Sequence, residues 1–254
     1  MPGLEDKLIV ALDVDRLDKA KELVDKLYPT VKLFKVGSSL FPIHGLEVIK
    51  MIGAKGGKVF LDLKSLDIPN TVSMSLASGT AYSVIDSVPV KMTAANSLKE
   101  TVSNVMQYPI FMMTVHSLCG IDMLKAAVQG ARNKAAEIGR IPPYIVGVTV
   151  LTSEVSDENT SKRVLERARV VKDAGLDGVV CAVSEAAMIR KEFGEQFIIV
   201  TPGIRARGYK KDDQSRVATA QEAIKAGANY IVIGRPILEA KDPLGAVEQL
   251  ISKE

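Results

Sequence analysis

Short apolar segments recur along the chain, and segments with helical spacing separate them. Most of the apolar segments are rich in valine and isoleucine and run nearly unbroken, which is typical of strands buried on both faces of a parallel sheet. This pattern predicts strands over 8–14, 31–37, 58–64, 111–116, 144–152, 178–183, 197–204 and 230–237.

The intervals between these strands carry the apolar spacing of amphipathic helices. Within 17–27, apolar residues fall on one helical face. Thr219 and Glu222 form a capping-box sequence that predicts the start of a late helix. Asp242 followed by Pro243 has the order of an N-cap and a first helical residue, so it predicts the start of the last helix.

Eight strands that alternate with helices over about 250 residues are typical of a (β/α)8 TIM barrel. We therefore predict an α/β fold with a single domain over 1–254. A doubly wound open sheet is the alternative, although no GxGxxG sequence follows the first strand. The stretch 73–110 is long for one return between strands three and four, and we predict an extended segment there with a second helix near 97–106.

Composition narrows the functional classes. The net charge is only +3 and tryptophan is absent, which does not suggest a nucleic-acid surface. Cys119 and Cys181 show no metal-ligand spacing, so we expect reduced core residues of a cytoplasmic protein. Segment 1–7 lacks a signal-peptide pattern, and no apolar run reaches about 18 residues, so we expect no membrane span.

Polar side chains stand at the predicted carboxyl ends of the strands, where TIM barrels place their active sites. Asp62 and Lys64 alternate, so both are expected to point into the barrel. Because buried charges are costly unless paired, we predict an alternating chain of charges that holds Lys64 rigidly. A network that only fixes strand register is the alternative, but five charges at one barrel end favour function. The five charged residues are Asp13, Lys35, Asp62, Lys64 and Asp67.

The last two strand ends suggest a phosphate site. Gly234 would let backbone N–H groups approach a phosphate, and Arg235 would add a charged contact. Arg205 precedes the basic loop 206–216, which has the character of a lid. An ordinary turn and a solvated loop are the alternatives for these two features. We expect His44 on a surface helix. His116 could lie near the site, but a structural histidine is the interpretation that we favour.

Segment 62–71 resembles the signature of the orotidine 5′-phosphate decarboxylase family. Its Asp-x-Lys-x-x-Asp core is shared with sugar-phosphate decarboxylases, and the following Ile-Pro-Asn-Thr makes the resemblance specific. Further segments agree in order and spacing, so that the resemblance covers nearly the whole chain. They are 11–13, 35–37, 151–153, 201–205, 213–214 and 234–235.

The resemblance implies decarboxylation of orotidine 5′-phosphate to uridine 5′-phosphate, the last step of de novo UMP synthesis. Lys64 would be the proton donor, and Asp62 would lie beside the substrate carboxylate. The resemblance implies no metal and no organic cofactor. It implies a homodimer with shared active sites, in which Asp67, Ile68 and Thr71 reach the neighbouring site. The implied substrate contacts are Asp13 and Lys35 for the ribose, Thr152 for the pyrimidine, and Arg205, Gln214, Gly234 and Arg235 for the phosphate side.

Three other functions fit parts of the pattern. A sugar-phosphate decarboxylase or aldolase of the same superfamily would share the core motif and would typically need Mg²⁺. A non-catalytic binder of nucleotide phosphates would keep the cavity without the chemistry, although the intact charge cluster counts against it. A structural barrel with no ligand is the third alternative.

Overall fold

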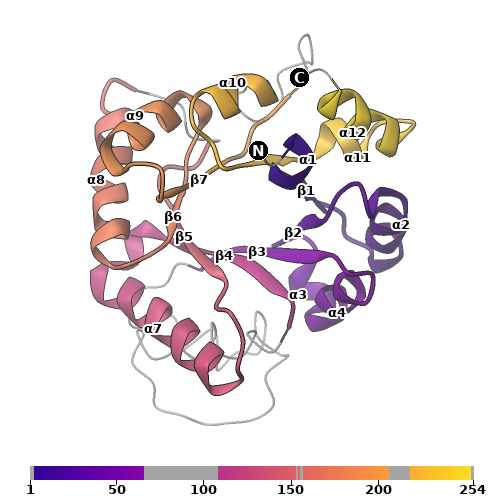
Figure 1. Ribbon diagram of the computed structural model, residues 1–254, viewed down its shortest axis with the longest axis horizontal. Helices are drawn as coiled ribbons and strands as arrows, with labels where there is room; N and C mark the ends of the chain where they lie inside the picture. The colour runs from indigo at the N-terminus through magenta and orange to yellow at the C-terminus, as the bar shows by residue number, and fades with distance from the viewer. Residues whose placement is uncertain (1–2, 66–107, 153, 155–156, 206–217, 253–254) are drawn as a thin grey trace.

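The eight apolar segments form the strands of a closed parallel barrel (Figure 1). The computed structural model describes residues 3–65, 108–152, 154, 157–205 and 218–252. Most of the predicted excursion 73–110 lies outside the described residues. The strands are β1 Leu8–Ala11, β2 Leu33–Gly37, β3 Lys58–Ser65, β4 Ile110–His116, β5 Tyr144–Val148, β6 Gly178–Val180, β7 Ile198–Thr201 and β8 Tyr230–Ile233.

Each strand pairs in parallel with its neighbour in sequence, and β8 pairs with β1 to close the ring. In this last pair, Ile9 lies opposite Val232, so the first and last strands share one hydrogen-bonded ladder. A doubly wound sheet would leave two edges unpaired. The predicted TIM barrel is therefore confirmed.

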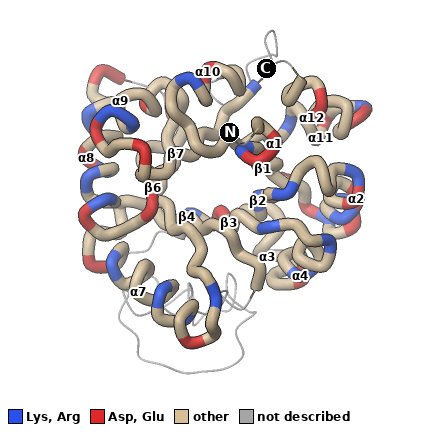
Figure 2. The backbone as a smooth tube through the Cα atoms, in the orientation of Figure 1, with Lys and Arg blue, Asp and Glu red and all other residues tan. Residues whose placement is uncertain are grey.

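The longer helices lie outside the ring of strands, and the early helix Leu17–Leu27 is a neighbour of the last helix, Pro243–Ile251, there (Figure 1). In Figure 2, acidic and basic segments are interspersed on α2, α8 and α9. Within the described ranges, no helix is both long and apolar enough to cross a membrane. The helices are α1 Leu4–Lys7, α2 Leu17–Leu27, α3 Phe41–His44, α4 Leu46–Ala54, the 3-10 turn η1 Ser117–Cys119, α7 Ile121–Glu137, α8 Thr160–Asp173, α9 Val183–Phe193, α10 Ala220–Lys225, α11 Arg235–Leu238 and α12 Pro243–Ile251.

The predicted helix starts are confirmed in detail. The Thr219 side chain accepts a hydrogen bond from the Glu222 N–H, and the Glu222 carboxylate accepts one from the Thr219 N–H. This reciprocal capping box satisfies two N–H groups that the first turn of α10 leaves without helical partners. Asp242 caps α12 by accepting a hydrogen bond from the Gly245 N–H at 3.1 Å.

Several strands are shorter than their apolar segments suggest. β5 ends at Val148 rather than residue 152, and β6 ends at Val180 rather than residue 183. β8 ends at Ile233 because Gly234 leaves the extended conformation and Arg235 begins α11. The apolar residues beyond these ends are buried by loops and helix starts, which periodicity alone does not distinguish from strand.

The β3–β4 pair is irregular at its carboxyl end. Leu61 lies opposite Met113, and the next paired residues are Ser65 and Val115. Four steps along β3 therefore match only two along β4. Strand irregularities of this kind re-aim side chains, and they recur at barrel rims and next to active sites.

Aromatic side chains fill the amino-terminal end of the barrel interior. The Phe111 ring packs edge-on against Tyr144 and Tyr230, with ring centroids 5.4 and 5.6 Å apart. The Lys58 ammonium lies 5.3 Å from the centre of the Phe111 ring. Burial raises the pKa of the Tyr230 hydroxyl. This end of the barrel is thus packed, which leaves the carboxyl end for chemistry.

Arg190 on α9 joins three backbone segments, and its side chain is only 13% exposed. Its guanidinium donates hydrogen bonds to the Gly194, Phe197 and Gly227 carbonyl groups and to the Asn229 side chain. We expect Arg190→Ala to lower the free energy of unfolding by about 3 kcal/mol, because it leaves these carbonyl groups and the Asn229 side chain without this hydrogen-bond donor. Urea denaturation followed by circular dichroism measures this change.

The matched control is Arg169→Ala. Arg169 pairs with Glu192 on the surface, and both side chains are about half exposed. We expect its loss to cost less than about 1 kcal/mol. Equal losses in the free energy of unfolding for the two variants would show that the hydrogen bonds of Arg190 contribute no more to stability than a surface ion pair does.

Candidate active site

A cavity of about 360 Å³ opens at the carboxyl end of the barrel. Its lining comes from residues at or just beyond the ends of β1, β2, β3, β5, β6, β7 and β8. This is the face on which TIM barrels carry their active sites. The polar lining residues are Asp13, Lys35, Ser38, Asp62, Lys64, Thr152, Arg205 and Arg235, and the others are Ala11, Phe60, Leu151, Val180, Pro202, Gly203, Val232 and Gly234.

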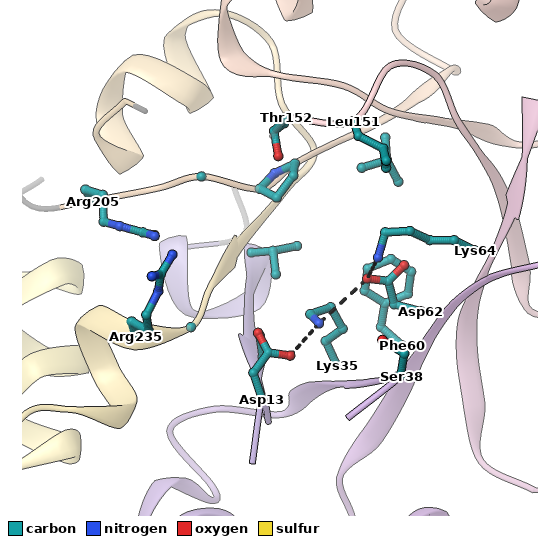
Figure 3. Close-up of a pocket in the computed structure, with 16 residues that line it drawn as sticks. Asp13, Lys35, Ser38, Phe60, Asp62, Lys64, Leu151, Thr152, Arg205 and Arg235 are labelled. Atoms are coloured by element: carbon teal, nitrogen blue, oxygen red, sulfur yellow. Dashed lines mark hydrogen bonds and ion pairs between the residues drawn. The ribbon is translucent and has the colours of Figure 1, made fainter. Parts of the chain in front are cut away.

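Four of the five predicted charges form a continuous chain along one wall of the cavity (Figure 3). The Lys35 ammonium lies 2.8 Å from Asp13 Oδ1 and 3.7 Å from Asp62 Oδ2. The Lys64 ammonium lies 2.7 Å from the same Asp62 oxygen. Opposite charges therefore alternate from β1 to β3, as the sequence predicted for these four. Asp67, the fifth charge, lies outside the described residues.

The two inner members of this chain are buried. The side chains of Lys35 and Asp62 are 12% and 9% exposed, whereas Lys64 is 41% exposed and reaches into the cavity. Burial alone would lower the pKa of the Lys35 ammonium, but the Asp62 and Asp13 carboxylates outweigh it and raise this pKa above its ordinary value. Lys35 is thus a fixed cation.

Lys64 has an unusual backbone conformation. Its φ is +48°, and among the described residues it is the one non-glycine with a positive φ. An L-residue in this left-handed region costs about 1–2 kcal/mol and persists only where its surroundings hold it. Asp62 and Lys64 both line the cavity and meet as predicted, although β3 is not a regular strand at Lys64. The register shift between β3 and β4 falls in the same stretch, between Leu61 and Ser65.

Two guanidinium groups converge on the opposite side of the cavity. Arg205 and Arg235 point toward one another in Figure 3, from the segments that follow β7 and β8. Arg205 is buried, and its Nη1 donates to the Ile204 carbonyl at 2.9 Å. Two cations that converge at the edge of a cavity form a site for an anion with more than one negative charge.

Every described residue predicted for the site lines this one cavity. These residues are Asp13, Lys35, Asp62, Lys64, Thr152, Arg205, Gly234 and Arg235. The predicted residues Asp67, Ile68, Thr71 and Gln214 lie outside the described residues, as does the predicted lid 206–216.

Neither of the two histidines and neither of the two cysteines is among the residues that line the cavity. His116 is buried at the end of β4, where its Nδ1 accepts a hydrogen bond from the Leu118 N–H. Burial lowers the pKa of His116, and the nearby charges of Arg167 and Lys64 add to this effect. His44 ends α3 and bonds the Asp15 carbonyl oxygen. Cys119 and Cys181 are buried thiols.

Thr114 on β4 was not predicted from the sequence, yet it contacts two of the cavity residues. Its hydroxyl contacts both the Asp62 carboxylate and the Lys64 backbone. Its hydroxyl group in the strand Ile110–His116, whose residues before Thr114 are all apolar, was the available signal. Ser38, which follows β2 and lines the cavity, was also missed.

The cavity therefore has two chemical ends. One end presents an ammonium group held against a carboxylate, which together can stabilise a developing negative charge and deliver a proton. The other end presents two guanidinium groups suited to an anion. Among the residues that the structure describes, no group of three or more histidine, cysteine, aspartate or glutamate side chains could hold a metal ion.

Comparison with known proteins identifies the family of this chain. Residues 6–250 match the family described as orotidine 5′-phosphate decarboxylase / HUMPS. Proteins named orotidine 5′-phosphate decarboxylase from Moorella thermoacetica and Legionella pneumophila (strain Corby) are 39% and 40% identical to this chain. The alignments cover 98% and 96% of this chain, and 92% and 97% of the relatives.

A solved structure shows the same architecture. The crystal structure of orotidine 5′-phosphate decarboxylase from Lactobacillus acidophilus superposes with a TM-score of 0.72 at 33% identity, and 97% of each chain is covered. The family match and the relatives both extend over nearly the whole chain, including the strand ends that build the cavity. This chain belongs to the orotidine 5′-phosphate decarboxylase / HUMPS family.

Proposed function

We propose that this protein decarboxylates orotidine 5′-phosphate to uridine 5′-phosphate and CO2, in the last step of de novo UMP synthesis. The names of the relatives support this substrate. The observation that carries the proposal is the Lys64 ammonium, which lies 2.7 Å from Asp62 Oδ2 and reaches into the cavity. This pair supplies what the reaction needs, a fixed cation with a proton to give.

The chemical step breaks the bond between C6 and the carboxylate. Its electron pair stays on C6, and CO2 leaves. No ring position delocalises this carbanion well, so the protein must stabilise it electrostatically. Lys64 then transfers a proton to C6, which yields uridine 5′-phosphate and a neutral amine that solvent reprotonates. We assign to Asp62 the position beside the leaving carboxylate, where its negative charge favours departure.

The rest of the cavity binds the parts of the substrate that do not react. We assign Asp13 and Lys35 to the ribose hydroxyl groups and Thr152 to the pyrimidine. Arg205, Gly234 and Arg235 take the phosphate, which the two converging guanidinium groups support. Gln214 completes this side in our proposal. Binding energy gained at the phosphate can then serve the reaction at C6.

We further propose a cytoplasmic homodimer in which Asp67, Ile68 and Thr71 enter the partner's site. The family resemblance supports this arrangement, because it implies that these residues reach the neighbouring subunit's site.

We propose that the reaction requires no metal or organic cofactor. Lys35 and Lys64 already lie within 3.7 Å of carboxylates on the reacting side of the cavity. A divalent cation there would have to lie beside two ammonium groups, which repel it. The charge that stabilises the carbanion comes from Lys64 in this proposal.

The decisive experiment follows the absorbance of orotidine 5′-phosphate on mixing with the purified protein, with and without EDTA. We expect rapid loss of absorbance that EDTA leaves unchanged. Because sugar-phosphate decarboxylases share the Asp-x-Lys-x-x-Asp core of segment 62–67, a Mg²⁺-dependent activity of that kind is the competing result. Activity that EDTA abolishes, or tight binding of a uridine phosphate without CO2 release, would overturn the proposal.

A further inference from the structure

We infer that Thr114 is a positioning residue that holds the Lys64 ammonium and the Asp62 carboxylate in the geometry needed for proton transfer. The inference rests on the proposed function, and it assigns a role to a residue of β4 that is absent from the cavity lining. Thr114 would act only through its two neighbours on β3.

The Thr114 hydroxyl bonds both Asp62 and Lys64, although Thr114 itself does not line the cavity. Thr114 is 2% exposed, and its Oγ1 accepts a hydrogen bond from the Lys64 backbone N–H at 2.8 Å. The same hydroxyl donates to Asp62 Oδ1 at 3.0 Å. A backbone N–H can only donate and an ionised carboxylate can only accept, so both directions are fixed. Lys64 then bonds the other oxygen of this carboxylate, Oδ2.

The location of Thr114 explains why β3 needs this contact. In the β3–β4 ladder, Met113 pairs with Leu61 and Val115 pairs with Ser65, so Thr114 lies opposite the bulge that contains Asp62 and Lys64. A hydroxyl group takes the Lys64 N–H where a regular parallel ladder would offer a carbonyl oxygen. The hydrogen bond thereby secures the left-handed backbone conformation of Lys64.

Loss of this hydroxyl would release both catalytic groups at once. The Lys64 backbone could relax toward the extended conformation, and its ammonium would shift away from the reacting carbon. A small displacement of a catalytic group costs roughly 100-fold in rate. The guanidinium groups of Arg205 and Arg235 lie on other strand ends, so substrate binding should change little.

The test compares Thr114→Val, which keeps the shape but removes the hydroxyl, with Thr114→Ser, which keeps the hydroxyl. We expect kcat of the valine variant to fall roughly 100-fold, with KM within about threefold of wild type. The serine variant should keep kcat within about fivefold of wild type. If Thr114 had only a structural role, its loss would lower the melting temperature but would not lower kcat selectively while KM stayed nearly unchanged.

Thr149→Val is the matched control. Thr149 is also a fully buried threonine, at the end of β5, and its hydroxyl donates to the Val180 carbonyl at 2.9 Å. Its removal likewise deletes a hydrogen bond of a buried hydroxyl, and it touches neither Asp62 nor Lys64; the Val180 carbonyl keeps the Thr149 N–H as a donor at 3.2 Å. We expect its kcat to stay within about threefold of wild type.

The outcomes separate this inference from the proposed function. An inactive wild type overturns the proposed function and the inference with it. An active wild type with unchanged kcat in Thr114→Val, or with equal losses in the serine and valine variants, overturns the inference alone. If Thr114→Val does not fold, Thr114→Ala replaces it. A kcat of Thr114→Ser at least tenfold higher than that of Thr114→Ala then supports the inference, and a smaller difference overturns it.

Discussion

Lys64→Ala is expected to lower kcat for orotidine 5′-phosphate decarboxylation by more than about 10⁴-fold while the barrel stays folded. Two effects are lost together, because the ammonium group both stabilises the carbanion and supplies its proton. Each effect is typically worth about 10²–10³-fold or more. The absorbance assay gives kcat, and circular dichroism with a thermal scan reports folding.

The cost in stability should be small. The Lys64 side chain is 41% exposed, and Asp62 keeps Thr114 as a hydrogen-bond donor and Lys35 at 3.7 Å. An ion pair with one partly exposed member contributes about 1 kcal/mol or less. Loss of activity can thus be separated from loss of fold.

Two further lysine variants sharpen this prediction. Lys64→Arg keeps a positive charge but cannot release its proton, so we expect it to be nearly as inactive as the alanine variant. Lys58→Ala changes the same residue type at the opposite end of β3, where Lys58 packs over Phe111. It should keep kcat within about twofold. Wild-type turnover in Lys64→Ala would refute the proposed mechanism.

The barrel and the composition of its cavity were predictable from sequence because both follow from local patterns. Unbroken apolar segments indicate strands buried on both faces, and barrel geometry gathers their carboxyl ends at one mouth. Asp13 and Arg235 stand more than 200 positions apart in the chain, yet both line the cavity because each follows a strand. The prediction required only the strand ends, which the sequence marks with polar residues.

The fine geometry of the site depends on contacts that no local pattern carries. The left-handed conformation of Lys64 depends on a hydrogen bond to Thr114, fifty residues further along the chain. Its position is set by the register shift between β3 and β4. Arg190 similarly bonds carbonyl groups up to 37 residues away. Such features arise from tertiary register, whereas periodicity reports only which face of an element is buried.

Asp62→Asn is expected to lower kcat roughly 1,000-fold while strengthening the binding of orotidine 5′-phosphate relative to uridine 5′-phosphate. The two ligands differ in the carboxylate at C6. If Asp62 lies beside that group, its negative charge opposes substrate binding and is relieved when CO2 leaves. Asparagine keeps the shape of the side chain and removes its charge. The repulsion between residue 62 and the substrate carboxylate is then lost, and so is the acceleration that this repulsion gives to the loss of CO2.

The measured quantity is the ratio of the two dissociation constants, with kcat from the absorbance assay. Calorimetry gives Kd for uridine 5′-phosphate, and a rapid-mixing titration gives Kd for the substrate. We expect the ratio of substrate Kd to product Kd to fall about tenfold or more, which corresponds to about 1.4 kcal/mol. The expected change is smaller than the repulsion between two unscreened carboxylates, because the Lys35 and Lys64 ammonium groups both lie close to Asp62 and offset its charge.

The variant should also be less stable. The pKa of Lys35 is raised in the folded protein because Asp62 and Asp13 outweigh its burial. This interaction stabilises the fold below the unfolded pKa of Lys35, and the contribution is lost as pH rises through the higher folded value. Asp62→Asn removes part of it, so the free energy of unfolding should fall at neutral pH.

Asp13→Asn separates the role of Asp62 from the general effect of removing a carboxylate. Asp13 bonds the same Lys35 ammonium at 2.8 Å, but it lies at the other end of the charge chain from Lys64. We expect its loss to weaken both ligands equally through the ribose, which leaves the ratio of dissociation constants unchanged. A ratio that falls in both variants, or in neither, would place the carboxylate of the substrate away from Asp62. A fall confined to Asp62→Asn would instead fix the orientation of the substrate, with C6 toward β3 and the phosphate toward Arg205 and Arg235.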